Sequence, residues 1–244
     1  ANASYDSVSF NVGNQETYPT ELTFNNDGSK MYVLGLFSKT IYQYSLSTKF
    51  DVSTASYDSV SFSAGSQLSF AGAFVFNNDG TKLYATGEAQ DAVFQYSLST
   101  AYNVGTASYD NVTFSVSSQE GGATAIEFST DGTKMYILGW QNDTVFQYTL
   151  TSAFDLSTAS YASKSFSIAT QESTPHALRF NPDGTKMYVI GTGQDKVFQY
   201  TLSTAFDVST ASYDSVSFSV ATQESVPYAM AFKNDGSKLY VVGD

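Results

Sequence analysis

The chain has 244 residues, and 23 Asp and Glu residues outweigh 11 Lys and Arg, for a net charge of −12. This charge disfavours binding to nucleic acid through phosphate neutralisation, so we expect no nucleic-acid partner. Aromatic residues make up 16% and charged residues 14% of the chain, which excludes a disordered protein. The absence of any apolar run near 18 residues argues against membrane insertion. There is no cysteine, so disulfides and thiol chemistry are excluded.

A single repeat runs through the whole sequence. An Asp-Gly pair recurs every 52 residues without insertion or deletion, at Asp27, Asp79, Asp131, Asp183 and Asp235. Phe, Lys-x-Tyr, Ala-Ser-Tyr and aromatic-Gln-Tyr positions keep the same spacing. We therefore expect one domain over 1–244, with repeat units at about 1–52, 53–104, 105–156, 157–208 and 209–244.

Read in chain order, one unit predicts four strands. In the fourth copy these are residues 177–181, 187–190, 197–202 and 213–220. The first two are joined by a hairpin turn at 181–185, where Gly184 is free to adopt a positive φ. Residues 203–210 form a polar connection that contains two apolar residues, Phe206 and Val208. The last strand alternates, with Val216, Phe218 and Val220 on one face and serines on the other.

Four strands in a period near 50 residues are typical of a propeller blade. Closing such blades into a ring buries apolar faces that one unit cannot bury alone. The sequence therefore predicts an all-β, five-bladed β-propeller with four antiparallel strands per repeat.

The segment Tyr188-Val189-Ile190-Gly191 and its counterparts follow Asp-Gly-x-Lys and resemble the YVTN-type repeats of lactonase-like propellers. The longer repeated segment, which runs from Asn-Asp-Gly-Thr-Lys to Val-Ser-Thr-Ala-Ser-Tyr, resembles repeats in surface and virion proteins of marine bacteria and their phages. The resemblance covers the whole chain. It implies an adhesive role at an extracellular or virion surface.

The two ends of the chain do not match a whole number of repeats. Five units would need 260 residues, whereas the chain has 244, and the fifth copy stops after its second strand. Residues 5–12 instead read as a fourth strand without a preceding unit. We expect a last blade that is incomplete or closed by this N-terminal strand. A native chain that continues past Asp244 as part of something larger, or a strand lent by another chain, would complete it.

Comparison of the five copies shows two variable stretches, after the fourth strand and after the second strand. Because strand direction alternates within a blade, both stretches lie on one face of the disc, around the central channel. Aromatic rings beside Asn, Gln and Asp suit the stacking and hydroxyl contacts of sugars. The predicted ligand-binding residues on this face are Tyr18, Phe37, Phe70, Trp140, Asn142, His176, Gln194 and Tyr228.

The leading functional hypothesis from these residues is a non-enzymatic adhesion module that binds a glycan or another cell-surface ligand. No metal or other cofactor is expected. The recurring Asp residues of the Asp-Gly pairs are explained by their role in hairpin turns, and the sequence has no His or Cys cluster.

Two alternatives remain open. The first is a glycoside hydrolase or lactonase-like enzyme with a site in the channel, where Glu21 and Glu127 are the candidate carboxylates. Arg179 shares the repeat position of Glu127, so an ion pair in the channel is the simpler expectation. His176 is the one histidine, and no Gly-x-Ser-x-Gly elbow accompanies it. The second alternative is a structural spacer, which predicts no deep pocket on the variable face.

Overall fold

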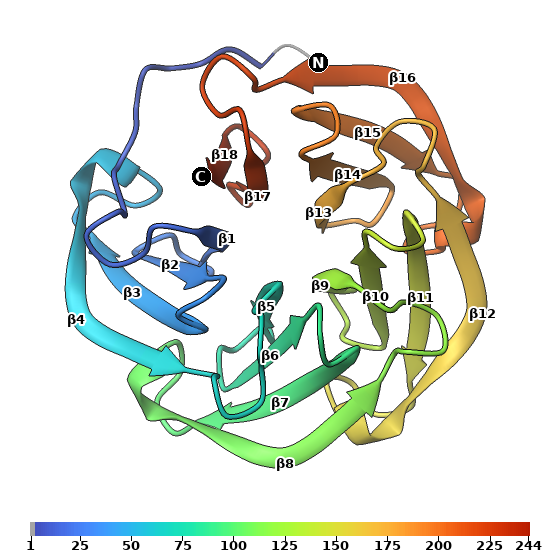
Figure 1. The fold of residues 1–244 in the computed structure, drawn as a ribbon, viewed down its shortest axis with the longest axis horizontal. Helices are drawn as coiled ribbons and strands as arrows, with labels where there is room; N and C mark the ends of the chain where they lie inside the picture. The colour runs from blue at the N-terminus through green and yellow to red at the C-terminus, as the bar shows by residue number, and fades with distance from the viewer. Residues whose placement is uncertain (1–2) are drawn as a thin grey trace.

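A computed structural model describes residues 3–244 as a ring of blades around a central axis (Figure 1). Four blades are four-stranded antiparallel sheets, and a two-stranded sheet occupies the fifth place. The strands of the first two blades are β1 (Pro19–Phe24), β2 (Lys30–Gly35), β3 (Thr40–Leu46), β4 (Ala55–Ser63), β5 (Ala73–Phe76), β6 (Lys82–Gly87), β7 (Ala92–Leu98) and β8 (Ala107–Ser115). Those of the other three are β9 (Ala123–Phe128), β10 (Lys134–Gly139), β11 (Thr144–Leu150), β12 (Ala159–Ser167), β13 (Pro175–Phe180), β14 (Lys186–Gly191), β15 (Lys196–Leu202), β16 (Ala211–Ser219), β17 (Pro227–Phe232) and β18 (Leu239–Gly243). The predicted all-β propeller is confirmed.

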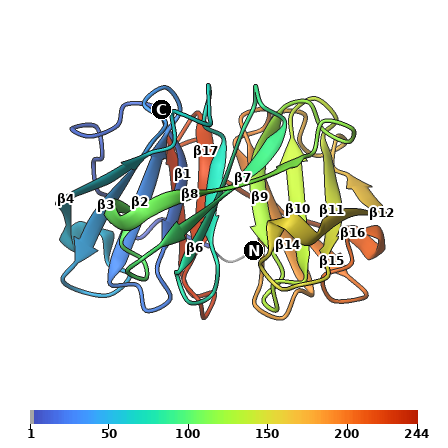
Figure 2. The same cartoon turned by 90° about the horizontal axis from the view of Figure 1, so that it is seen from below.

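The innermost strands β1, β5, β9, β13 and β17 surround the axis, and the long fourth strands form the outer wall (Figure 1). Seen from the side, the strands span between the two faces of the disc (Figure 2). We call the end with the loops after the second strands the variable face, and the opposite end the Asp-Gly face. No helix within residues 3–244 is long and apolar enough to cross a bilayer.

The Asp-Gly turns owe their constancy to packing. Gly184 has φ 70°, a left-handed conformation that favours glycine. A Cβ there would lie 2.3 Å from the Phe206 ring, so a larger residue does not fit. The Asp183 carboxylate accepts hydrogen bonds from the Thr185 backbone N–H at 2.9 Å and its hydroxyl at 2.6 Å. Turn formation therefore accounts for the recurring Asp residues of the Asp-Gly pairs.

Tyrosines of the second strands tie four of the five blades to the next blade. The Tyr32 hydroxyl donates to the Tyr102 carbonyl at 2.6 Å, and the Tyr136 hydroxyl donates to the Phe206 carbonyl at 2.7 Å. The equivalent bond from Tyr240 to the Phe50 carbonyl, at 2.5 Å, joins the fifth blade to the first and closes the ring.

Replacing Tyr240 by Phe is expected to lower the free energy of unfolding by about 1 kcal/mol, because one hydrogen bond is lost without a change of shape. Tyr188→Phe is the matched control. Tyr188 occupies the same repeat position, and its hydroxyl has no hydrogen-bond partner among residues 3–244. Urea denaturation of both variants measures the difference, and equal losses would show that ring closure does not depend on this bond.

The fifth blade is incomplete, as predicted. Strand β17 pairs with β18, and no other strand of the described chain joins this sheet. Residues 5–12 pass outside β17 and β18 (Figure 1) but form no ladder, so the predicted N-terminal strand is wrong as a paired strand. The physical reason is that a fourth strand pairs with the third strand of its blade, and residues 3–244 supply no third strand here.

Candidate functional site

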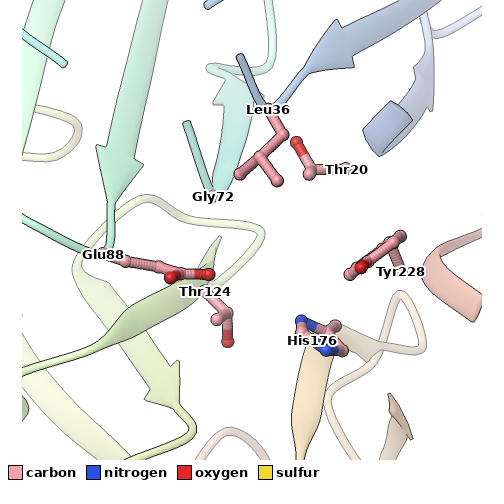
Figure 3. Close-up of a pocket in the computed structure, with 7 residues that line it drawn as sticks. All are labelled: Thr20, Leu36, Gly72, Glu88, Thr124, His176 and Tyr228. Atoms are coloured by element: carbon pink, nitrogen blue, oxygen red, sulfur yellow. The ribbon is translucent and has the colours of Figure 1, made fainter. Parts of the chain in front are cut away.

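A pocket with a volume of about 100 Å³ opens on the axis at the variable face (Figure 3). It is lined by Thr20, Leu36, Gly72, Glu88, Thr124, His176 and Tyr228. Five of these residues occupy one repeat position, at the start of each inner strand, and Leu36 and Glu88 share a second position, directly after β2 and β6. The pocket therefore exists because the ring closes, and every blade contributes a residue to it. The expectation that both variable stretches meet around the channel is confirmed.

β-Bulges aim four of these side chains at the axis. The pairing register shifts at Thr20, Thr124, His176 and Tyr228, each of which is skipped between two paired neighbours. A bulged residue is unpaired and adds local twist, which redirects its side chain. Figure 3 shows His176 and Tyr228 on one side of the pocket, facing Glu88 and Thr124 on the other.

His176 is a neutral polar group in this pocket. Burial lowers the pKa of its imidazole to about 4, so the ring carries no charge at pH 7. Its Nε2 lies 3.3 Å from the Thr192 hydroxyl, and its ring meets the Tyr228 ring edge to face with centroids 4.7 Å apart. These contacts hold the imidazole in place, where a neutral ring both donates and accepts hydrogen bonds.

Glu88 is the carboxylate of the pocket lining. Burial raises its pKa above the ordinary value, and interaction with the Trp140 side chain opposes the rise. The Thr20 hydroxyl donates to the Ala71 carbonyl at 3.1 Å, and the Thr124 hydroxyl donates to the Pro175 carbonyl at 3.0 Å. Because their protons are engaged, both hydroxyls present acceptor lone pairs to a ligand. The pocket thus combines a base, a neutral imidazole and several acceptors.

Deeper in the channel, Arg179 joins two carboxylates from other blades. Its guanidinium contacts the Glu21 carboxylate through Nη2 and the Glu127 carboxylate through Nη1 at 3.4 Å. The three side chains are 12%, 1% and 18% exposed, respectively. Arg179 and Glu127 lie three residues along their strands from the pocket positions, which places them roughly 10 Å below the mouth. The predicted channel ion pair is confirmed and extended to a triad.

One guanidinium does not compensate two buried carboxylates, so the triad keeps an excess negative charge. Burial raises the pKa of Glu21 to about 7 and raises that of Glu127 as well, although Arg179 opposes both shifts. The two carboxylates also raise the pKa of Arg179 against its own burial. Both acids are bridged by a cation and are not free to face a substrate across an open cleft, as glycoside hydrolysis requires.

Glu21 makes the stability of the protein depend on pH. Its pKa is 4.5 in a free chain and about 7 when folded, so the folded state binds the proton more tightly. Its contribution to the free energy of unfolding is therefore complete below about pH 4.5 and is lost as the pH rises through 7, by about 1–3 kcal/mol. His176 acts in the opposite sense between pH 4 and 6.5, because its folded pKa is depressed.

The Glu21→Gln variant separates the two effects, because His176 is the same in both proteins. Between pH 5 and 8, urea denaturation is expected to show a loss of stability in the unmodified protein that is smaller in the variant. Parallel pH profiles would mean that Glu21 ionises normally in the folded state.

The eight residues predicted to bind a ligand are distributed over three places. His176 and Tyr228 line the pocket. Tyr18, Phe37 and Phe70 form a rim cluster, with ring centroids 5.2 and 6.0 Å apart, and are 40%, 51% and 43% exposed. Trp140, Asn142 and Gln194 lie on the loops between the second and third strands. Ligand contact by all eight residues stays a prediction.

Sequence reasoning missed Thr20, Leu36, Gly72, Glu88 and Thr124. All five belong to the stretches that vary between copies, and Glu88 is a carboxylate where the first, third and fourth copies have Leu, Trp and Thr. This difference between the copies was the feature of the sequence that could have identified Glu88 as a candidate site residue.

Glu120 and Glu172 share another repeat position, and their carboxylates have a structural role. The Glu172 carboxylate accepts hydrogen bonds from the backbone N–H groups of Thr174 at 2.9 Å, Gly193 at 2.9 Å and Gln194 at 3.2 Å. It thereby fixes the two variable loops of its blade to each other, and Glu120 does the same in the third blade through Gly122 and Gln141.

Residues 37–244 match the family model described as "Lactonase, 7-bladed beta-propeller". The match covers more than half of the chain, and the chain belongs to this family of lactonase-like propellers. The structure contains four complete blades and a partial fifth, fewer than the seven of the family description. A search of the curated proteins found no match.

Solved structures share the fold. A Lactobacillus plantarum protein is 15% identical with a TM-score of 0.59, and a proposed 6-phosphogluconolactonase from Bacteroides uniformis is 14% identical with a TM-score of 0.56; the alignments cover 92% of this chain and 64% of each structure. A periplasmic gluconolactonase from Pseudomonas aeruginosa is 16% identical with a TM-score of 0.53, over 92% of this chain and 63% of that one. The chain thus spans less than two thirds of the length of these structures.

The family match corrects the functional prediction. A non-enzymatic adhesion module, with carbohydrate binding and virion association, is contradicted by membership in a lactonase family and by neighbours named as gluconolactonases. The prediction gave most weight to exposed aromatic rings on the rim. The same variable loops also place a carboxylate and a neutral imidazole on the axis, and that arrangement suits an enzyme.

Proposed function

We propose that this protein is a hydrolase that opens the ring of a small, uncharged lactone in the axial pocket. The observation that carries the proposal is the pocket itself, where Glu88 with a raised pKa faces neutral His176 at the mouth of a lactonase-family propeller. Titratable groups with shifted pKa values in a concave site are typical of acid–base catalysis.

Lactone hydrolysis needs a base for the attacking water and a donor for the oxygen on which charge develops. In the proposed mechanism the Glu88 carboxylate takes a proton from water as the water oxygen attacks the lactone carbonyl carbon. The His176 imidazole, uncharged at pH 7, donates a hydrogen bond to the developing oxyanion. As the carbonyl re-forms, the ring C–O bond breaks, and the proton held by Glu88 passes to the leaving alkoxide. The product is a hydroxy acid.

The charge of the site selects the substrate class. No Lys or Arg lines the pocket, and its one histidine is neutral. The nearest guanidinium along β13, that of Arg179, is already bound by two carboxylates. A phosphorylated lactone would find no cation there and would meet a protein of net charge −12. We therefore favour a neutral sugar lactone. The hydroxyls of such a ligand would donate to Thr20 and Thr124.

The experiment that tests the proposal is a pH-stat assay with δ-gluconolactone and 6-phosphogluconolactone, each corrected for spontaneous hydrolysis. We expect saturable hydrolysis of the neutral lactone and a lower kcat/KM for the phosphorylated one. No acceleration of either would reject the proposal, and a preference for the phosphorylated lactone would reject the assigned substrate class.

An extracytoplasmic location is part of this proposal. It is supported by the periplasmic gluconolactonase among the structural neighbours. Detection of the protein with antibodies in fractionated source cells would test it, and recovery in the cytoplasm alone would reject it.

A further inference from the structure

Glu88 is held by a side chain from the next blade, that of Trp140. The two residues share one repeat position, directly after β6 and β10, and they meet because adjacent blades bring these positions together. The Trp140 side chain hydrogen-bonds to the Glu88 carboxylate and opposes the rise in pKa that burial causes. An indole Nε1–H is a donor only, so the carboxylate accepts this bond. Trp140 is not one of the residues that line the pocket.

Gly122 makes room for the indole. A Cβ at Gly122 would lie 2.6 Å from Trp140 Nε1 and 2.8 Å from Cε2, so the nitrogen edge of the ring occupies the space that a side chain would fill. The other four copies have Tyr, Phe, Thr or Val at the position of Gly122, and none of them has Trp at the position of Trp140. The third copy therefore combines a missing side chain with the ring that fills its place.

Hydrogen bonds fix the backbone on which the indole stands. The Trp140 N–H donates to the Gly122 carbonyl at 3.2 Å. The buried Glu120 carboxylate accepts from the N–H of Gly122 at 2.9 Å and from that of Gln141 at 3.3 Å. The segment before β9 and the loop after β10 are thus joined on both sides of Trp140, and the indole N–H has a defined direction.

The other ionisable groups around Glu88 do not replace this donor. Across the pocket, His176 is neutral at pH 7, and the pKa of Tyr228 is raised by burial. The Asp244 carboxylate and the Tyr18 phenol lie near Tyr228 and raise its pKa further. Their fields act on Glu88 whether or not the indole N–H is present, so a substitution of Trp140 alone isolates the effect of the indole.

We infer that Trp140 is a positioning residue for the proposed general base, and that its indole N–H holds the Glu88 carboxylate in the orientation in which it meets water. A hydrogen bond to the carboxylate leaves it further lone pairs with which to accept a proton. The inference rests on the proposed function, because a base is needed only if the pocket hydrolyses a lactone.

The first part of the test is the kinetics of Trp140→Phe with δ-gluconolactone. This variant keeps an aromatic ring at a site that is 44% exposed and removes the N–H. Loss of one hydrogen bond to a charged group is expected to lower kcat about tenfold and to leave KM unchanged, since Trp140 does not line the pocket. Because the N–H favours ionised Glu88, the midpoint of the pH–rate profile should rise by about one pH unit. In a Glu88→Gln background the same substitution should change kcat less than about twofold.

Two further variants control for structural effects. Gly122→Ala keeps the indole, but its methyl group takes the place of the ring nitrogen, so this variant should reproduce the loss of kcat and the higher midpoint. Tyr148→Phe removes a hydrogen bond of the same blade, from the Tyr148 hydroxyl to Gln119 at 3.3 Å, and should preserve both values.

The second part of the test needs no substrate. Trp140 is the one tryptophan of the chain, so its fluorescence emission reports on this site alone. Protonation of a carboxylate that an indole contacts changes the emission, and we expect a transition with a midpoint above the ordinary 4.5 of a glutamate. The transition should be lost in Glu88→Gln, which assigns it to Glu88 and not to Glu120 or His176.

Three results would overturn the inference. An emission transition that persists in Glu88→Gln would show that the indole does not sense Glu88. Kinetics of Trp140→Phe equal to those of Tyr148→Phe would remove the positioning role, and a raised KM with unchanged kcat would make Trp140 a ligand contact. Absence of hydrolysis by the unmodified protein would reject the proposed function and the catalytic role of Trp140 with it, whereas the emission transition tests the contact with Glu88 separately.

Discussion

Replacing Glu88 by glutamine is expected to lower kcat for hydrolysis of a neutral lactone by two to three orders of magnitude and to leave KM nearly unchanged. Glutamine has the same shape and still hydrogen-bonds, but it does not accept a proton from water, and a positioned general base contributes about 10²–10⁴-fold. Because burial raises the pKa of Glu88, the rate of the unmodified protein should rise with pH through a midpoint above the ordinary 4.5 of a glutamate. This pH dependence should disappear in the variant.

Asp155→Asn is the matched control. It makes the same change of charge on the Asp-Gly face, where the second repeat already has Asn103 at this position. Both side chains accept a hydrogen bond at 3.1 Å from a backbone N–H of the following turn. If Glu88→Gln retains the activity and pH profile of the control, Glu88 is not the base, and the assignment of the axial pocket as the active site is wrong.

Replacing Arg179 by methionine is expected to lower the free energy of unfolding at pH 8 by about 3–5 kcal/mol, because two buried carboxylates lose their shared cation. The loss should be smaller at pH 5, since the pKa values of both carboxyls are raised and protonation removes the uncompensated charge. Urea denaturation at the two pH values measures this difference.

The triple variant Glu21→Gln, Glu127→Gln, Arg179→Met provides the control. Without the carboxylates, an apolar residue in the place of Arg179 should cost little, and the second and fifth repeats have Val75 and Ala231 there. We expect the triple variant to lie within about 1 kcal/mol of the unmodified protein. An Arg179→Met protein as stable as the unmodified one at pH 8 would show that the triad is not ionised.

The fold followed from the sequence because the repeat is local. Three features can be read from the sequence without knowing which segments touch: the alternation of apolar and polar residues within the strands, the Asp-Gly turns and the 52-residue period. The strands expected at 187–190 and 197–202 are observed as β14 and β15, one or two residues longer. The N-terminal strand failed because a strand exists only with a partner, and pairing is not a local property.

The site was predicted in part. Variation between copies located the variable face and included His176 and Tyr228, and the shared repeat position of Glu127 and Arg179 anticipated their contact. Thr20 and Thr124 were missed because their role comes from bulges that aim them at the axis. Glu88 was missed because it looked like one more polar residue of a loop.

The sequence by itself determined the blade, its turns and the number of copies, since these depend on spacings within 52 residues. Closure of the ring decided the chemistry of the axis. Residues from different repeats, such as Glu88 and His176, or Glu21 and Arg179, meet only when the blades are arranged around a common centre. The raised and lowered pKa values arise there as well, because burial is a property of the assembled ring and not of any one repeat.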